Sequence, residues 1–292
     1  MPTQLSLDLI CQRWTNRKAS YRPLQEPINP EQFRVDVIQE SVARLFVQAN
    51  HYSSTFPAAI ASIGLYEREG HFQERLVGVA VFSSPMNAKA ADSYGAAGHS
   101  FCDLGRFVLL DHVGGNGETW FLRRAIAALK ALKQRENGRP KYDLCLAYSD
   151  PTPRLKADGT LVFRGHYGGI YQSSALYLGR ATPRNLWLAP DGTIVSERSL
   201  SKIRTGDRGS DGAYKRLVSL GAPPIRHGES SRDYLARALG EGPFRRIRHR
   251  GNHAYAIPAG NHKTRKIVRS LMRSDLPPPR RTDPLPTDNR PL

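Results

Sequence analysis

Hydrophobic and polar positions follow two different periods along the first two thirds of this 292-residue chain. Apolar side chains recur at helical spacing over residues 37–50 and again over residues 118–135. Shorter apolar runs, typical of strands, lie at residues 62–68, 75–85, 103–110 and 142–150. The pattern therefore predicts the order helix, strand, strand, strand, helix, strand, which is an α/β (α+β) core.

The last third of the chain has shorter apolar runs and more basic residues. The dipeptide Asp191-Gly192 between two apolar runs predicts a hairpin, and residues 210–225 and 231–239 have the spacing of short helices. The end of the chain is rich in proline and lacks apolar periodicity, which predicts disorder. We therefore expect an N-terminal arm (1–30), a core (31–183), a basic extension that completes the core (184–262) and a disordered tail (263–292).

A glycine-rich turn joins the third predicted strand to the long helix. Gly114, Gly115 and Gly117 leave backbone N–H groups uncovered at the positive end of that helix, where a phosphate or pyrophosphate binds readily. The spacing fits neither the dinucleotide-binding pattern nor the P-loop. The alternative is a plain glycine turn before a helix, with Asn116 as the N-cap and Glu118 in the first turn.

This turn resembles the pyrophosphate loop of the GNAT acyltransferases, with His112 where Gln or Arg is usual. The order of the predicted elements resembles that fold as well. The resemblance implies a splayed central mixed sheet flanked by helices, with an acyl-CoA-type cofactor in the opening. It assigns cofactor binding to Arg106, Gly114, Gly115, Asn116, Gly117 and Glu118.

The charge of the chain is uneven. Residues 180–292 contain 23 Lys and Arg and 10 Asp and Glu, a net charge of +13, whereas residues 1–179 carry +4 of the total of +17. A basic final third favours a polyanionic partner. The alternative is a solubilising basic surface with no specific partner.

The remaining composition bounds the compartment. Three widely spaced cysteines, Cys11, Cys102 and Cys145, support neither a disulfide framework nor a zinc ribbon. The sequence has no apolar run of 18 residues and no signal-peptide pattern at its start. We expect a cytoplasmic protein without a membrane segment.

Five short motifs in order resemble the Mom family of phage DNA-modification proteins. They are His51-Tyr52-Ser53, Leu104-Gly105-Arg106, residues 116–121, Tyr148-Ser149-Asp150-Pro151, and residues 165–179. The resemblance covers residues 35–205 and, more loosely, 253–255. It implies a GNAT-like enzyme that converts the exocyclic amine of adenine in DNA to an acetamido (carbamoylmethyl) form and protects phage DNA from restriction.

The resemblance also implies the catalytic residues. The family's His-Tyr pair falls on His51 and Tyr52, its strand-end aspartate on Asp150, and its following tyrosine on Tyr171, beyond an apparent insertion at 151–164. An exocyclic amine is a poor nucleophile, so its attack needs a proton acceptor such as His or Asp. A tyrosine could stack on the base, donate a hydrogen bond or protonate a leaving thiolate.

Other roles for the same residues stay open. His51 and Tyr52 could cap the preceding helix, and Asp150 before proline could be a turn residue. His51 and Asp150 could instead bind a metal, since histidine and carboxylate suit iron. The other histidines of interest lack metal-ligand spacing, and solvated or phosphate-contacting positions are expected for His166, His249, His253 and His262.

An enzyme acting on a base must flip it out of the duplex or bind single strands. Basic residues of the final third could hold the backbone, namely Lys202, Arg204, Arg245, Arg246, Arg248 and Arg250. The partners implied are DNA and acetyl-CoA or an amine-bearing acyl-CoA, and a homodimer stays open. The alternatives are an ordinary GNAT acyltransferase acting on a small amine or protein, and a non-enzymatic DNA-binding protein.

Overall fold

The computed structural model describes residues 9–16, 18–23, 27–53, 55–70, 73–272 and 276–280. The chain forms two compact units. The core unit comprises the described parts of 1–149, 166–180 and 253–281, and the inserted unit comprises 150–165 and 181–252. The chain therefore passes from the core unit to the inserted unit and back twice.

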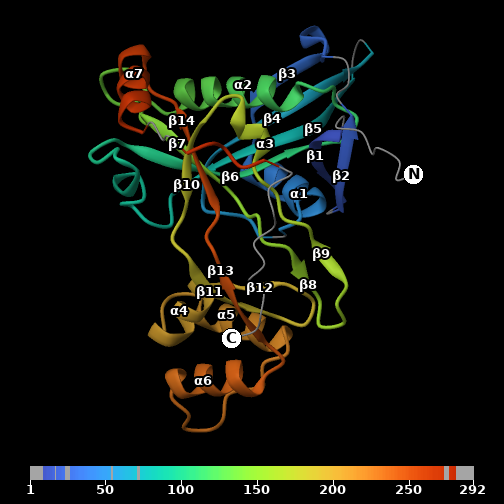
Figure 1. Cartoon of the computed structure of the whole chain (residues 1–292), viewed down its shortest axis with the longest axis vertical. Coiled ribbons are helices and arrows are strands. Elements are labelled where there is room, and N and C mark those ends of the chain that lie inside the picture. Colours follow the sequence, from blue (N-terminus) through green and yellow to red (C-terminus); the bar gives the residue numbers. More distant parts are fainter. Residues whose placement is uncertain are drawn as a thin grey trace. The chain divides into compact units, whose positions relative to one another are not determined.

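A seven-stranded mixed sheet forms the centre of the core unit (Figure 1). Its strand order is β10 (Leu176–Arg180), β14 (His253–Pro258), β7 (Leu144–Ser149), β6 (Phe101–Leu109), β5 (Gln73–Ser83), β4 (Ala59–Glu69) and β3 (Phe33–Val37). The four strand runs predicted from apolar spacing are all present, as β4, β5, β6 and β7. The prediction of a mixed sheet flanked by helices is thereby confirmed.

The contact between β6 and β7 divides this sheet. It is a parallel pair, whereas the other neighbouring strands of the sheet run antiparallel. The pairing covers only Phe101–Asp103 opposite Leu144–Leu146. Beyond these residues β6 stays paired with β5, and β7 stays paired with β14. Toward their carboxyl ends, β6 and β7 are therefore no longer paired with each other.

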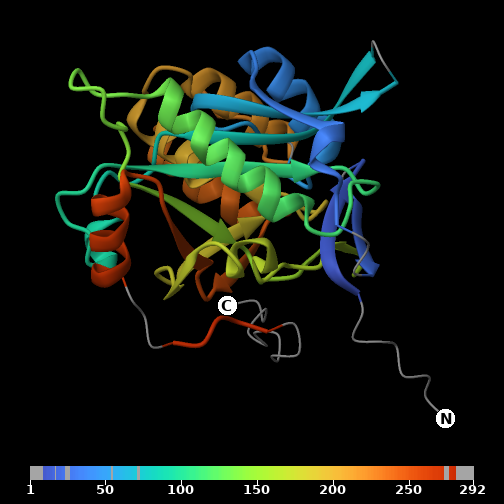
Figure 2. The same ribbon diagram turned by 90° about the horizontal axis from the view of Figure 1, so that it is seen from above.

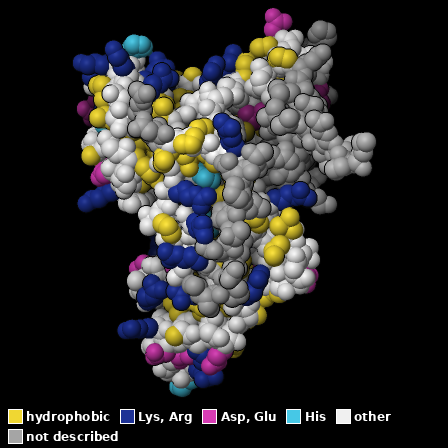
Figure 3. All heavy atoms as spheres, viewed as in Figure 1, with side chains coloured by type: hydrophobic (Ala, Val, Ile, Leu, Met, Phe, Trp, Pro, Cys, Tyr) yellow, Lys and Arg dark blue, Asp and Glu magenta, His cyan; other side chains and the backbone are white. Residues whose placement is uncertain are grey.

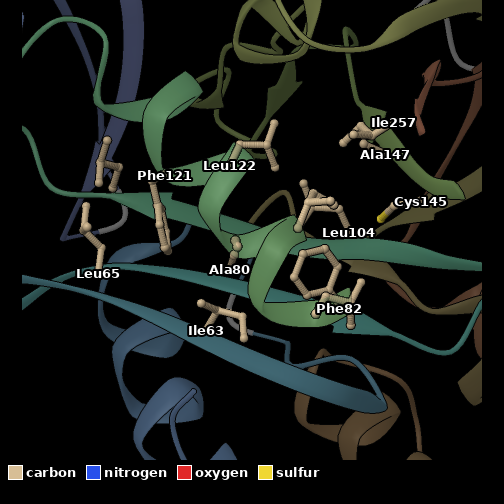
Figure 4. Packing of buried hydrophobic residues seen from close by; sticks show 14 of the residues in the cluster. Ile63, Leu65, Ala80, Phe82, Leu104, Phe121, Leu122, Cys145, Ala147 and Ile257 are labelled. Atoms are coloured by element: carbon tan, nitrogen blue, oxygen red, sulfur yellow. The ribbon is translucent and has the colours of Figure 1, made fainter. Parts of the chain in front are cut away.

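Helices cover both faces of the sheet. Helix α2 (Gly117–Leu132) runs across one face (Figure 2). Its Phe121 and Leu122 are directed at strand residues such as Ile63 and Leu104 (Figure 4). Helix α1 (Glu40–Asn50) packs Ala43 and Val47 on the other face. Burial of these side chains is the main favourable term that holds the layers together.

Smaller elements complete the core unit. Strands β1 (Leu9–Thr15) and β2 (Lys18–Pro23) form a hairpin. The others are the short helices η1 (Pro30–Gln32), η2 (Asp92–Tyr94) and α3 (Gly169–Gln172), and helix α7 (His262–Leu271).

The inserted unit combines short strands with three helices. Its strands are β8 (Arg154–Leu155), β9 (Leu161–Phe163), β11 (Arg184–Leu188), β12 (Ile194–Val195) and β13 (Arg245–His249). Its helices are α4 (Glu197–Thr205), α5 (Ser210–Ser219) and α6 (Ser231–Glu241), which pack around Tyr234. The predicted hairpin at Asp191-Gly192 and the two predicted helices after it are confirmed.

Two predictions differ from the structure in where a helix lies. The regular helix begins at Glu40, because the preceding residues pair with β4 as the edge strand β3. Disorder from residue 263 is wrong for 263–271, which form α7, capped by Asn261 and anchored by buried Val268. The rest of that predicted tail is described only at 272 and 276–280.

The N-terminal segment also differs from the expected arm. Its hairpin belongs to the core unit, as do the described residues of 253–281, so the boundary at 30 does not separate compact units. The boundary at 183 lies close to the change of unit between residues 180 and 181. Within the described part of the chain, the helices are all too short or too polar to span a membrane.

Candidate functional site

The glycine turn leads from β6 into α2 with the backbone close to its neighbours. A Cβ on Gly117 would lie 2.7 Å from Cγ1 of Val113, so a larger residue would push the turn open. Asn116 occupies the N-cap position without a side-chain cap bond, because its Oδ1 accepts from the Ile28 N–H (2.9 Å). The side chain of Asn116 therefore fixes the turn to the segment before β3.

The guanidinium of Arg13, in strand β1, binds the carbonyl oxygens of this turn. Its Nη1 donates to the carbonyl oxygens of Leu110 (3.0 Å) and Val113, and its Nη2 donates to that of Gly114 (2.9 Å). The same guanidinium pairs with the carboxylate of Glu118 through Nε (2.6 Å) and Nη2 (3.0 Å). Arg13 and Glu118 are only 3% and 5% exposed. The Glu118 carboxylate thus stabilises the turn, because it pairs with the guanidinium that binds the carbonyl groups of the turn.

His112 lies at the outer end of the turn. Its Nε2 is 2.8 Å from Oε2 of Glu67, and Arg75 lies 3.1 Å away. The imidazole is exposed and tied to the strands β4 and β5. Its side chain therefore contacts the sheet at the position where the GNAT pattern has Gln or Arg.

His51 and Tyr52 follow α1 directly. The His51 N–H donates to the Val47 carbonyl (2.8 Å), so His51 is the C-cap residue of the helix. Its buried ring accepts the Ser53 N–H at Nδ1 (3.0 Å), which assigns the proton of the neutral ring to Nε2. The rings of His51 and Tyr52 stack with centroids 4.1 Å apart, and Tyr52 meets the edge of His166 (5.9 Å).

Arg106 on β6 fastens the loop after this His-Tyr pair. Its Nη2 donates to the carbonyl of Thr55 (2.7 Å) and its Nε to the same oxygen (3.1 Å). Burial lowers the pKa of Arg106, and the nearby phenols of Tyr52 and Tyr171 oppose that shift. Arg106 thus links the two tyrosines electrostatically.

Tyr171 lies in α3, inside the aromatic cluster that covers β14. Its ring is 5.2 Å from that of Tyr255, and burial raises its pKa above the ordinary value, so the phenol stays protonated at neutral pH. Gly168 precedes the helix with φ +69°, and a Cβ there would lie 2.7 Å from the Tyr255 ring and 2.8 Å from the Tyr171 ring. Only glycine fits this close approach without strain.

Asp150 follows β7 and begins the inserted unit. Its Oδ1 accepts from the Thr152 N–H (2.9 Å) and from Nε2 of His249 (2.9 Å). Burial alone would raise the pKa of Asp150, but the bond from His249 and the charge of Arg154 lower it below the ordinary value. The carboxylate is therefore ionised and a weak proton acceptor.

Two of the histidine predictions are wrong. His249 is 1% exposed and pairs with Asp150, and His253 is buried, with its Nδ1 2.8 Å from the Tyr177 hydroxyl. The burial pattern of β13 alternates, with Ile247 and His249 inside and Arg246 and Arg248 outside. This alternation with a period of two is the sequence pattern that indicates burial of His249. It is hard to recognise because most residues of the segment are arginine.

Asp103 on β6 was not singled out by its sequence context. It is the last β6 residue that pairs with β7, and its buried Oδ1 has no hydrogen-bond partner among the described residues. Burial raises the pKa of Asp103 to about 7. Burial, with a smaller contribution from the charge of Asp103, raises the pKa of the Tyr148 phenol. A carboxyl group poised near neutral pH is a common feature of functional sites.

A comparison with protein families decides the assignment that the geometry leaves open. The model of the Mom protein family matches residues 32–226, about two thirds of the chain. The chain belongs to the Mom protein family. No curated protein matches it. Membership of the Mom family points to phage DNA modification and thus to a DNA-modifying enzyme.

The predicted site residues of this Mom-family chain fall into groups, each described within its own unit. Tyr52, Arg106 and Tyr171 of the core unit are electrostatic neighbours. The glycine turn is a second group in that unit, held by Arg13. Asp150 belongs to the inserted unit, where its partners are His249, Thr152 and Arg154.

A metal at His51 and Asp150 has little support from the donors available. Within the described ranges, no group of three or more His, Cys, Asp or Glu could hold a metal ion. Nδ1 of His51 and Oδ1 of Asp150 already accept backbone N–H groups. These residues therefore do not fit a preformed three-ligand iron centre.

The basic residues predicted to bind DNA all lie in the inserted unit of this Mom-family protein. Lys202 and Arg204 are in the last turn of α4, and Arg246, Arg248 and Arg250 are exposed on or after β13. Arg245 instead donates to the Leu155 carbonyl (2.7 Å). Lys and Arg side chains are widespread on the face drawn in Figure 3.

Proposed function

We propose that this Mom-family protein transfers a group from an acyl-CoA-type donor to the exocyclic amine of adenine in DNA. The product is the acetamido (carbamoylmethyl) base, which protects phage DNA from restriction. The observation that carries the proposal is the β6, glycine turn, α2, β7 arrangement, in which the parallel strands separate after three paired residues.

This arrangement supports a GNAT-like fold. The β6–β7 ladder ends after Asp103 and Leu146, and we infer that an extended, amide-containing cofactor arm would lie between the two strands beyond that point. The glycine turn at the start of α2 offers N–H groups and the positive helix end to a pyrophosphate. The guanidinium of Arg13 is a hydrogen-bond donor and binds carbonyl oxygens of the turn, so it does not compete for those N–H groups.

The tyrosines and His51 suit recognition of the base and the leaving group. Tyr52 can stack on a flipped adenine, as aromatic side chains commonly do. With Nδ1 engaged, neutral His51 presents Nε2–H and acts as a donor that orients its neighbours. Tyr171 stays protonated and can donate a hydrogen bond to a departing thiolate.

Asp150 and Asp103 suit different steps. The ionised Asp150 can accept a hydrogen bond from the adenine amine and raise its nucleophilicity without taking the proton. Asp103, with a pKa of about 7, is the better proton acceptor at neutral pH. An amine-bearing donor such as a glycyl derivative would supply the extra nitrogen of the product. Attack of the adenine amine on its carbonyl carbon releases the thiolate and gives an isomer of the carbamoylmethyl base, so a rearrangement must follow the acyl transfer.

Mass analysis of nucleosides from DNA of cells that express the chain tests the proposal. We expect a new adenine species that is lost with Tyr52→Ala, strongly reduced but still measurable with Asp150→Asn, and retained with the exposed control Arg44→Ala. Unmodified DNA together with acyl-CoA binding would favour an ordinary GNAT acyltransferase. DNA binding without cofactor binding would favour a non-enzymatic role.

A further inference from the structure

The imidazole of His249 is fixed at both of its nitrogens. Nδ1 accepts the Gly251 N–H (3.0 Å), so the proton of the neutral ring is on Nε2, which donates to Oδ1 of Asp150 (2.9 Å). The ring is 1% exposed. Water therefore does not compete for either bond.

The Gly251 N–H is itself held in place by the fold. Gly251 has φ +92°, and a Cβ there would lie 1.8 Å from the Ala181 carbonyl oxygen. The Ala181 N–H donates to the Asn252 carbonyl (2.8 Å), which pins the same short segment. The backbone thus selects one tautomer of His249 and one orientation of its ring.

The other contacts of Asp150 leave His249 as its main side-chain donor. Thr152 supplies a backbone N–H to the same oxygen, Oδ1 (2.9 Å), and Nη2 of Arg154 lies 4.0 Å from Oδ2. Without His249 the carboxylate would keep one hydrogen bond and a distant charge. It could then rotate about its last torsion.

We propose that His249 is a positioning residue that orients the Asp150 carboxylate for the reaction. This inference rests on the proposed function, in which Asp150 contacts the adenine amine. His249 lies beyond residues 32–226, the range matched by the Mom family. The basic C-terminal part of the chain therefore supplies part of the site as well as contacts to DNA.

Rate measurements on His249 variants test this role. We expect His249→Ala to lower kcat for adenine modification about 10- to 100-fold, the range typical of a lost orienting partner, with little change in KM for DNA. His249→Gln keeps an N–H donor at the end of the side chain and is expected to recover most of the rate. Tyr214→Phe removes a hydrogen bond elsewhere in the inserted unit and controls for loss of stability.

The double variant decides whether His249 acts through Asp150. In an Asp150→Asn background, His249→Ala should cause no further loss of rate. An unchanged kcat in His249→Ala, or an equal loss in both backgrounds, overturns the inference.

A spectroscopic readout separates this inference from the proposed function. The Nε2–H resonance of His249 should appear in a ¹H–¹⁵N spectrum and shift or vanish in Asp150→Asn. If the wild type shows that coupling but leaves adenine unmodified, the proposed function fails and the pairing stands. If the resonance is the same in Asp150→Asn as in the wild type, the positioning role is wrong, whether or not adenine is modified.

Discussion

At the scale of single residues, Asp103 combines burial with a missing partner. Its Oδ1 has no hydrogen bond within the described structure, and its pKa is about 7. An unpaired carboxylate inside a protein lowers stability once it ionises. A residue that lowers the stability of its own fold in this way is a candidate for a functional role, because function is a reason to retain it.

Asp103→Asn is expected to stabilise the protein at high pH. The folded pKa of about 7 lies above the ordinary value of 3.8, so the penalty is absent below pH 4, grows between pH 4 and 7, and is complete above pH 7. We expect a gain of about 4 kcal/mol in the free energy of unfolding at pH 8 and almost none at pH 4. Urea titrations at both pH values measure it.

Asp158→Asn is the matched control, because Asp158 is exposed in a turn and a backbone hydrogen bond from Thr160 lowers its pKa. It should not gain stability at pH 8. An equal gain at pH 4 and pH 8 for Asp103→Asn would show that the effect is packing, not charge.

At the scale of elements, the glycine turn depends on a side chain about a hundred positions earlier. Arg13 satisfies the turn's carbonyl groups and neutralises Glu118, so β1, the turn and the start of α2 form one rigid group. A buried ion pair adds little net stability, but the loss of one partner leaves an uncompensated charge.

Arg13→Met should therefore cost about 3–5 kcal/mol of unfolding free energy, and Arg13→Met with Glu118→Gln should recover part of it. Arg44→Ala removes an exposed pair with Glu40 and should cost less than about 0.5 kcal/mol. Urea denaturation of the four proteins compares them. A single Arg13→Met as mild as Arg44→Ala would contradict the buried pairing.

Two adjacent glycines at α3 offer a second test at this scale. Gly168→Ala forces a left-handed residue and meets two tyrosine rings, whereas a Cβ on Gly169 meets nothing within 4 Å. We expect Gly168→Ala to cost about 1–3 kcal/mol and to lower activity by displacing Tyr171. Gly169→Ala should be neutral or gain up to about 1 kcal/mol, which thermal melts would reveal.

At the scale of the whole molecule, the net charge of +17 is expected to dominate DNA affinity. Arg246→Ala with Arg248→Ala should weaken binding uniformly across sequences. It should lower the slope of log affinity against log salt by about 1 per lost phosphate contact. Arg34→Ala, which removes a cation already paired with Glu74, should leave the slope unchanged. Fluorescence titrations at several salt concentrations give both slopes.

The sequence predicted the local elements well because their periodicity is local. The strands β4 to β7 and helices α1, α2, α5 and α6 follow from apolar spacing alone. Long-range partners do not: Arg13 pairs with Glu118, and Asp150 with His249, across about a hundred residues. The prediction for His249 is wrong because the lack of metal-ligand spacing says nothing about burial, whereas the alternation with Ile247 places the side chain inside.

The position of β14 governs the order in which this protein can be completed on the ribosome. When residue 252 has been made, β7 and β10 both lack the strand that lies between them. Each then presents an open edge that can pair with another chain. The sheet therefore closes only after β14 has been made. A chain that stops at residue 252 is expected in the insoluble fraction rather than as a smaller folded enzyme.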